Sequence, residues 1–369
     1  MLPGRETAAV SDVLFTGFPG FIGMRLLPRI LERRPDARVA CLVQDKFVDT
    51  ARRSLEALEA AHPQARGRLE LVLGDITLPG LGIELARARA LQASLREAWH
   101  LAAVYDLAVG RPLAERVNVD GTRNLLEFVG AAKRFERLQY VSTAYVSGRT
   151  RGEFRETDLD VGQGFKNHYE ETKFLAEVEV VRSKLPATIY RPGVVVGDSR
   201  TGETAKFDGP YAVLRMMERL PSPGVFPRVG IGRGTVNIVP VDFVVSAMAA
   251  LSAAPASRGL TYHLCDPQPH SPAELTQLFA SAFGKRFFYV PVPLVLARAC
   301  LSPPQLQRFF GITAQALEYF HDPVRHDTTQ ATRDLGALGV KCPRLADYLP
   351  QLISFYRSHK GEVRQHAMS

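Results

Sequence analysis

The sequence has few cysteines and no long apolar run. Its four cysteines, Cys41, Cys265, Cys300 and Cys342, lie far apart and form no Cys-x-x-Cys pair. This spacing argues against a zinc centre or a disulfide framework and fits a reducing compartment. No stretch approaches the roughly 18 apolar residues of a membrane span, and the N-terminus lacks the apolar core of a secretory signal. We therefore expect a cytoplasmic protein without a metal site or a membrane span.

A block of like charge is also missing. The net charge of +8 comes from 46 basic and 38 acidic residues scattered along 369 positions. Because no basic stripe interleaved with aromatic residues is present, we expect no nucleic-acid partner. A small anionic ligand, such as a nucleotide or a coenzyme A ester, needs only local positive charge. The composition, 46% hydrophobic and 23% charged, is typical of a globular protein with a large core.

Residues 11–24 predict a buried strand, a tight turn and the start of a helix. The turn contains three glycines at the spacing G-x-x-G-x-x-G: Gly17, Gly20 and Gly23. The first permits the strand-to-helix turn, the second lets a pyrophosphate approach the backbone, and the third lets the helix lie close to the sheet. The pattern predicts a dinucleotide site, with an ordinary glycine-rich turn as the alternative.

Strands and helices then alternate along the chain. Strands are expected at 38–43, 69–73, 98–103, 138–142 and 187–191, and helices at 21–34, 47–61, 83–96, from 118 onward and at 169–184. We expect Pro28 to kink or shift the first helix. The alternation predicts an α/β fold of the Rossmann type, with a doubly wound parallel sheet.

The Pro/Gly-rich stretch 220–234 marks a change of organisation. We expect residues 1–200 to form mainly a dinucleotide-binding domain whose sheet is completed by residues 235–245. Residues 201–369 are expected to form mainly a smaller, mixed substrate-binding region.

A second motif is Tyr169-x-x-x-Lys173 in an expected helix. The i, i+4 spacing places both side chains on one helix face, where the ammonium should lower the pKa of the phenol from its usual value of about 10. The tyrosine can then act as an acid toward a carbonyl or as a base toward an alcohol. Two unrelated surface residues would give the same spacing. The motif's position after Ser142-Thr143, at a strand end, favours an active site.

Further motifs complete the pattern: Gly74-Asp75-Ile76, His100-Leu-Ala-Ala103, Asn118-Val-x-Gly121-Thr122, Val141-Ser-Thr-Ala-Tyr-Val146, Tyr190-Arg-Pro-Gly193 and Asn237-Ile-Val-Pro-Val-Asp242. With them the sequence resembles the extended short-chain dehydrogenase/reductase superfamily. Within it, the chain is similar to the male-sterility branch, which contains fatty acyl-coenzyme A reductases and thioester-reductase domains. The resemblance covers residues 12–250 and continues weakly into 327–356.

The resemblance implies roles for individual residues. Tyr169 would be the proton donor, Lys173 its partner and the holder of the nicotinamide ribose, and Thr143 a hydrogen-bond donor to the substrate carbonyl. The cofactor would contact Gly17, Phe18, Pro19, Gly20, Phe21, Ile22, Gly23, Gln44, Lys46, Asp75, Ile76, Ala102, Ala103, Lys173, Pro192, Gly193 and Val194. The alternatives are a threonine bonded to the backbone and, at Asp75, a capping or turn aspartate. His100 and Asn118 are further candidates, although we expect His100 to be packed and hydrogen-bonded.

Cofactor choice depends on the segment after the second strand. Relatives that use NADPH commonly place an arginine where this chain has Gln44. Asp45 offers an acceptor for the ribose hydroxyls of NADH, whereas Lys46 and Arg25 are close enough in sequence to meet a 2′-phosphate. We favour NADP(H) and leave NAD(H) open.

Two enzymatic functions fit these features. The first is reduction of a fatty acyl thioester or an aldehyde, and the second is epimerisation or dehydration of a nucleotide sugar. A non-catalytic nucleotide sensor is disfavoured because the Thr-Tyr-Lys set is intact. The apolar segments 287–296 and 309–312 favour the first function if they wall an acyl slot, although an ordinary core has the same composition. We expect a small-molecule substrate (acyl-coenzyme A, acyl-carrier thioester or aldehyde) and leave a homodimer open.

Overall fold

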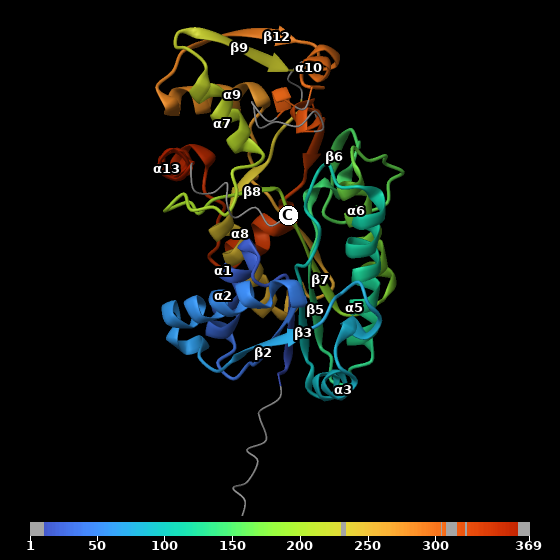
Figure 1. The fold of residues 1–369 in the computed structure, drawn as a ribbon. Helices are drawn as coiled ribbons and strands as arrows, with labels where there is room; N and C mark the ends of the chain where they lie inside the picture. Colours follow the sequence, from blue (N-terminus) through green and yellow to red (C-terminus); the bar gives the residue numbers. More distant parts are fainter. Residues whose placement is uncertain (1–10, 230–233, 304, 308–315, 322, 361–369) are drawn as a thin grey trace, which may run out of the picture.

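Seven parallel strands form the central sheet of the computed structural model, which describes residues 11–229, 234–303, 305–307, 316–321 and 323–360 (Figure 1). In spatial order they are β11 (Thr261–Leu264), β7 (Ala187–Pro192), β5 (Arg137–Val141), β4 (Glu97–His100), β1 (Val13–Thr16), β2 (Val39–Val43) and β3 (Leu69–Leu73). Most of these strands are short and buried on both faces, as a parallel sheet between two helical layers requires. The predicted doubly wound α/β fold is confirmed.

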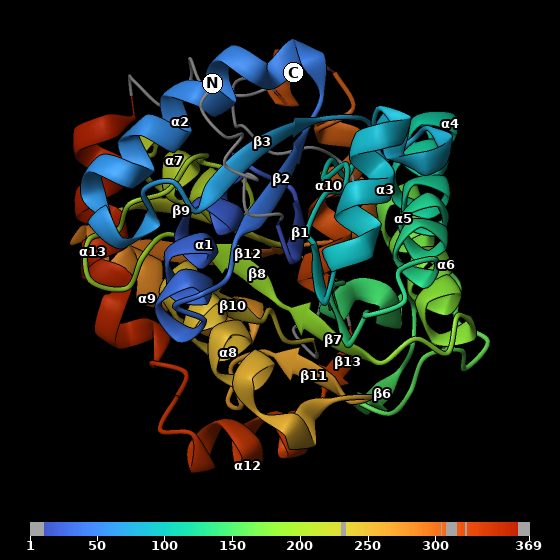
Figure 2. The same cartoon turned by 90° about the horizontal axis from the view of Figure 1, so that it is seen from below.

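Helices cover both faces of this sheet (Figures 1 and 2). One layer contains α1 (Phe21–Arg33), α2 (Val48–Ala61), α8 (Val241–Ala253) and α12 (Thr329–Ala337). The other contains α3 (Leu85–Ser94), α5 (Gly121–Gly130) and α6 (His168–Arg182). Helix α1 buries Leu26, Leu27 and Ile30 at helical spacing. It runs through Pro28 as one helix, and Pro28 is itself buried.

The sheet is not completed as predicted. Within residues 235–245, β10 (Ile238–Pro240) pairs with β8 (Val194–Val196) in a separate two-stranded sheet, and the seventh strand is β11. The chain leaves the main sheet just after Pro192. The Gly193 N–H still donates to the Leu264 carbonyl of β11, but the Val194 N–H donates to the Asn237 carbonyl, directly before β10. The expectation for 235–245 was therefore wrong.

Two connections contain structure that was not expected. The polar stretch 149–166 holds β6 (Gly152–Phe154), which pairs in parallel with β13 (Val324–His326) far along the chain. The helix expected from residue 118 begins earlier, as α4 (Arg111–Ala114) followed by a π-helical turn (Glu115–Asp120). Short 3₁₀ turns span Asp45–Phe47, Pro63–Ala65, Pro79–Gly82, Ala144–Ser147, Pro255–Ser257 and Ala316–His321.

A smaller layer lies at the end of the molecule that the carboxyl ends of the strands face (Figure 1). It contains α7 (Pro210–Arg219), β9 (Gly224–Val229), α9 (Pro272–Phe283), β12 (Phe287–Val292), α10 (Leu294–Cys300) and α13 (Leu345–His359). Its core joins Phe226 from β9 to Phe279 on α9 and Leu352 on α13. Over the parts of the chain that are described, no helix is long and apolar enough to cross a membrane.

Candidate active site

The glycine turn after β1 leaves no room for side chains. Gly17 has a φ of +91°, and a Cβ there would lie 2.9 Å from the Leu101 Cβ. A Cβ on Gly20 would lie 2.6 Å from the Gly17 carbonyl oxygen, and one on Gly23 would lie 2.8 Å from the same atom. The Gly20 N–H also donates to that oxygen at 2.8 Å. The turn therefore needs all three glycines to close on itself, in addition to any approach by a ligand.

The same turn leaves the start of α1 without a cap. Gly20 is the N-cap residue, no side chain caps the helix, and its first turn holds no acidic residue. Uncapped N–H groups with no carboxylate beside them suit a phosphate anion. The predicted cofactor residues Phe18, Pro19, Phe21 and Ile22 are part of this one turn-to-helix junction.

The predicted site residues gather at one edge of the central sheet. Thr16 lies in register between Leu42 on β2 and His100 on β4. Gln44 and Lys46 follow β2, Asp75 and Ile76 follow β3, Ala102 and Ala103 follow β4, Thr143 follows β5, and Pro192 ends β7. Carboxyl ends of parallel strands share an edge, and ligands bind there where the strand order reverses, which here falls between β1 and β4.

At the β2–β3 end of this edge, three of the predicted residues meet. The Asp75 carboxylate accepts the Thr77 N–H at 2.8 Å. Burial acts to raise the pKa of Asp75, but hydrogen bonds from Thr77 and from the Gln44 side chain, with the nearby Lys46 charge, lower it overall. Asp75 is therefore a turn aspartate, which was the alternative to a cofactor contact, and it is also a neighbour of Gln44 and Lys46.

Three other predicted cofactor residues, Ile76, Ala102 and Gly193, have contacts within the fold. Ile76 is buried against α5, where a Cβ on Gly121 would come 2.8 Å from its Cδ1. The Ala102 N–H donates to the Thr16 hydroxyl at 3.2 Å. A Cβ on Gly193 would lie 2.7 Å from the Asn237 carbonyl oxygen, which fixes the path of the segment 192–194. Contacts of these residues with a nicotinamide dinucleotide stay predictions.

The Thr143 hydroxyl lies beside the Tyr169 phenol, where it acts to lower the pKa of that phenol. Thr143 begins the 3₁₀ turn after β5, where its hydroxyl also accepts the Tyr145 N–H at 3.3 Å, and Tyr169 lies in the first turn of α6. Both are buried, with 4% and 7% of their surface exposed. The preceding Ser142 hydroxyl is buried without a hydrogen-bond partner among the described residues.

The expected lowering of the Tyr169 pKa does not occur in this structure. Burial raises its pKa above the usual value and outweighs the opposing effect of the Thr143 hydroxyl. Lys173 lies one turn along α6, but its ammonium donates to the Val141 carbonyl at 2.8 Å and to the Tyr140 hydroxyl at 3.2 Å. A phenol that keeps its proton throughout the neutral range is suited to donate that proton.

Lys173 is itself almost fully enclosed. Burial lowers its pKa to about 8, against the opposing attraction of Glu177. The ammonium also lies 4.7 Å from the centre of the Tyr140 ring. Tyr140 was not among the residues expected from the sequence. Strand alternation could have found it, because Tyr140 and Ser142 lie two residues apart on one face of the strand.

His100 and Asn118 hold the site together. His100 is buried between the hydroxyls of Thr16, 2.8 Å from Nδ1, and Thr122, 3.1 Å from Nε2. Burial lowers its pKa to about 3, so the ring is neutral, in agreement with the packed role expected for it. Asn118 accepts the Val104 N–H at 2.9 Å and donates to the Thr172 hydroxyl at 3.0 Å, which ties the loop after β4 to α6.

That loop supplies the apolar surroundings of Tyr169. Val104, Leu107 and Val109 cluster with Tyr169, and the Tyr105 ring meets the Tyr169 ring edge-on at 5.2 Å. About half of Tyr105 is exposed. The loop carries no motif, so the sequence offered no signal for its part in the site.

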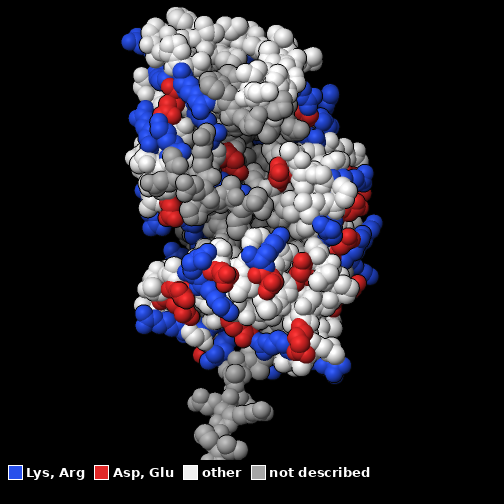
Figure 3. Space-filling view, in the orientation of Figure 1, with Lys and Arg blue, Asp and Glu red and all other residues white. Residues whose placement is uncertain are grey.

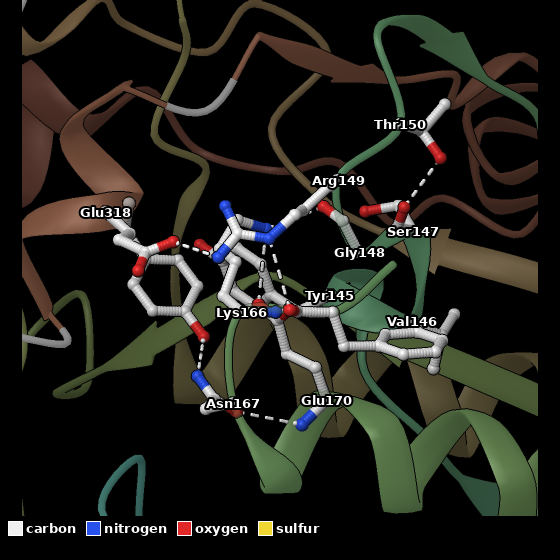
Figure 4. Close-up of polar contacts among 12 residues, drawn as sticks. Tyr145, Val146, Ser147, Gly148, Arg149, Thr150, Lys166, Asn167, Glu170 and Glu318 are labelled. Atoms are coloured by element: carbon white, nitrogen blue, oxygen red, sulfur yellow. Dashed lines mark hydrogen bonds and ion pairs between the residues drawn. The ribbon is translucent and has the colours of Figure 1, made fainter. Parts of the chain in front are cut away.

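The start of α6 is fixed by a segment from the C-terminal part of the chain (Figure 4). Asn167, the N-cap, accepts the Glu170 N–H at 3.0 Å and donates to the Tyr319 hydroxyl at 2.8 Å. Beneath it, the Lys166 ammonium lies 3.3 Å from the Glu170 carboxylate, with both side chains buried. Lys166 also donates to the Gly148 carbonyl at 2.6 Å. The turn that follows Thr143 is thereby joined to the residues that lead into α6 and Tyr169.

The predicted acyl slot is not formed by residues 287–296. Phe287 and Tyr289 pack on Phe226 in the core of the smaller layer, while Phe288 is 71% exposed. This part of the segment is therefore core on one side and surface on the other. Residues 309–312, the other half of that expectation, lie outside the described residues.

The geometry accommodates a nicotinamide dinucleotide. Four features lie along one sheet edge: an uncapped helix start, a glycine turn that a Cβ would fill, a buried lysine and the buried Ser142 hydroxyl, which has no hydrogen-bond partner among the described residues. Within the described part of the chain, no group of three or more His, Cys, Asp or Glu side chains is arranged to hold a metal ion.

Comparisons with known proteins agree with this geometry. A model of the family described as Male sterility protein matches residues 15–248. The chain is 27% identical to "Fatty acyl-CoA reductase wat" of Drosophila melanogaster over 64% of its length and 53% of that protein. It is 29% identical to "Isonitrile lipopeptide synthase" of Mycobacterium tuberculosis, over 72% of its length and 12% of that protein. The chain thus spans about half of the first relative and a small part of the second.

Solved structures of other proteins share the fold of this chain. The terminal R domain from the myxalamid PKS-NRPS biosynthetic pathway is 28% identical, with a TM-score of 0.78 and coverage of 97% of this chain and 93% of that one. A dTDP-glucose 4,6-dehydratase from Streptomyces venezuelae, 22% identical with a TM-score of 0.63 and coverage of 95% and 98%, shares the fold. The chain therefore belongs to the Male sterility protein family, within the extended short-chain dehydrogenases/reductases, and is an NAD(P)-dependent oxidoreductase.

Proposed function

We propose that the protein reduces fatty acyl thioesters, aldehydes, or both, with Tyr169 as the proton donor. The observation that carries the proposal is the buried pair of neighbouring hydroxyls, Thr143 and Tyr169, at the sheet edge that begins with the glycine turn. When bound, a reduced nicotinamide supplies hydride; the hydroxyl pair supplies a proton and a hydrogen bond.

The residues of the chain can manage the charge that such a reduction creates. As negative charge develops on the carbonyl oxygen, the Thr143 hydroxyl donates a hydrogen bond to it and Tyr169 gives it a proton. The remaining phenolate is stabilised by the Lys173 ammonium, which is charged below pH 8. With a thioester, the tetrahedral adduct collapses to a thiol and an aldehyde, and the aldehyde is the simpler second substrate.

An apolar substrate is supported by the surroundings of Tyr169. The loop residues Val104, Leu107 and Val109 cluster there, and an acyl chain that covers them removes apolar surface from water. Each fully buried methylene contributes up to about 0.8 kcal/mol. The similarity to a fatty acyl-CoA reductase supports the same class. We propose that medium and long chains are reduced better than short ones.

We propose NADP(H) as the favoured cofactor. Lys46 beside Asp75 and Gln44 provides a positive charge at the ribose end of the site. Asp45 is exposed next to it and would repel a 2′-phosphate, so the preference over NAD(H) is expected to be moderate.

The test is a side-by-side screen of the purified chain. Aldehydes of increasing length, acyl-coenzyme A esters and UDP-glucose are each offered with NADPH and with NADH, and Tyr169→Phe serves as the control for enzyme-dependent turnover. We expect reduction of aldehydes and, more weakly, of thioesters, with neither turnover nor thermal stabilisation by UDP-glucose. Interconversion of the sugar with all aldehydes inert would overturn the proposal in favour of a nucleotide-sugar enzyme.

A further inference from the structure

The two-stranded sheet of β9 and β12 has apolar side chains on both faces. On its inner face the Phe226 ring packs against Phe287 at 5.4 Å and Tyr289 at 6.2 Å. The outer face is exposed: Val225 is 58% accessible, Phe288 71% and Val290 46%. A sheet with one face in water normally alternates apolar with polar side chains. The outer face of this sheet breaks that pattern.

The strand register adds a cross-strand pair, and the next helix exposes two further apolar side chains. Val225 and Phe288 are directly paired across the two strands, so their side chains are neighbours. Helix α10 follows β12 after one proline and exposes Val295 by 80% and Leu296 by 55%. We call these five residues the outer apolar face. Figure 3 shows the upper end of the molecule, where β9, β12 and α10 lie, as largely free of charged side chains.

The segments that carry this face contain basic but no acidic residues. In β9, β12 and α10, and in the two residues directly before β12, these are Arg228, Lys285, Arg286 and Arg298. Lys285 donates to the backbone carbonyls of Met217, Glu218 and Leu220, and Arg298 pairs with Glu318. Arg286, at the start of β12, is exposed.

We propose that the outer apolar face docks on the surface of an anionic lipid bilayer. Apolar side chains that insert shallowly and basic side chains that meet acidic headgroups are the two contributions to such binding. A second copy of the chain is the competing occupant, since a two-fold contact would bury the same five residues on both copies, and the test below separates the two. The proposal concerns a surface at the end of the molecule and is independent of the substrate.

The test uses the full chain and vesicles. We expect flotation with vesicles of phosphatidylcholine containing phosphatidylglycerol, at least about 10-fold stronger than with phosphatidylcholine alone. Phe288→Asp combined with Val295→Asp should weaken binding to the anionic vesicles by about 10-fold or more. Leu85→Asp is the matched control, because Leu85 is 62% exposed at the start of α3 and should leave binding unchanged.

Three outcomes would overturn the proposal. They are no binding of the wild type to anionic vesicles, equal binding of the wild type and the double variant, and a concentration-dependent dimer that the double variant abolishes. Reduction of a soluble short aldehyde, expected to stay within about 2-fold in the double variant, shows that the variant is folded. Because this control is read separately, failure of membrane binding is distinguishable from failure of the proposed reductase function.

Discussion

The two ends of the predicted cofactor site differ in how far they exclude water. At the catalytic end, Thr143, Tyr169 and Lys173 are 4%, 7% and 4% exposed. At the ribose end, Asp45 and Lys46 are exposed. Burial is the largest influence on the pKa values of Tyr169 and Lys173, whereas charges in water are screened within about 10 Å. Substitutions at the buried end should therefore have large effects on turnover or stability. Substitutions at the ribose end should change only the preference between NADPH and NADH.

The strongest test of the comparison is Tyr169→Phe. Removal of the phenolic hydroxyl should lower kcat about 10²–10⁴-fold, the usual contribution of a general acid, and leave cofactor binding intact in a fluorescence titration. Tyr105→Phe is the matched control: its ring touches that of Tyr169 but is half exposed, so kcat should stay within about 3-fold. Wild-type turnover of Tyr169→Phe would remove the proposed role of the tyrosine.

The buried ion pair beside the catalytic helix is the next test. Lys166→Met leaves the Glu170 carboxylate buried without this cation. The free energy of unfolding should fall by about 3–5 kcal/mol, measured by denaturant titration. Lys133 is exposed, so Lys133→Met should change it by no more than about 0.5 kcal/mol. If both variants lowered the free energy of unfolding equally, burial would not explain the difference between the catalytic end and the surface.

The buried lysine predicts a pH dependence. Because the pKa of Lys173 is lowered to about 8, the ammonium is charged below that pH and neutral above it. Since we propose that this charge stabilises the phenolate left on Tyr169, kcat/KM for carbonyl reduction should fall about 10-fold between pH 8 and pH 9.5. Lys173→Arg keeps its charge and should flatten this limb. A wild-type profile that is level across the range would contradict the assignment.

The smallest effect is expected at the exposed ribose end. Gln44→Arg should shift preference toward NADPH by about 3–10-fold, because a guanidinium pairs with a phosphate through two hydrogen bonds. Asp45→Ala should shift it in the same direction by relieving repulsion. The measurement is the ratio of kcat/KM for NADPH and NADH. If neither variant moves this ratio, the segment after β2 does not contact the ribose.

Much of the fold and of the site was predictable because its signals are local. The glycine spacing at 17, 20 and 23 predicts one tight turn that has no room for side chains. The structure confirms this, because a Cβ at each position would lie too close to the Gly17 carbonyl or to Leu101. The alternation of apolar strands and helices predicted the doubly wound sheet. Parallel pairing then places every strand's carboxyl end at one edge, so residues from six strands could be assigned to one site.

What the sequence alone could not determine depends on contacts between distant segments. The seventh strand is β11 rather than residues 235–245, and β6 pairs with β13 about half the chain away. Lys173 bonds to Tyr140 and the Val141 carbonyl, and Asn167 to Tyr319. Spacing along the sequence predicts which side chains share a helix face or a strand. Which of them are buried together, and hence which pKa values shift and which charges pair, is decided by how the folded chain excludes water from that space.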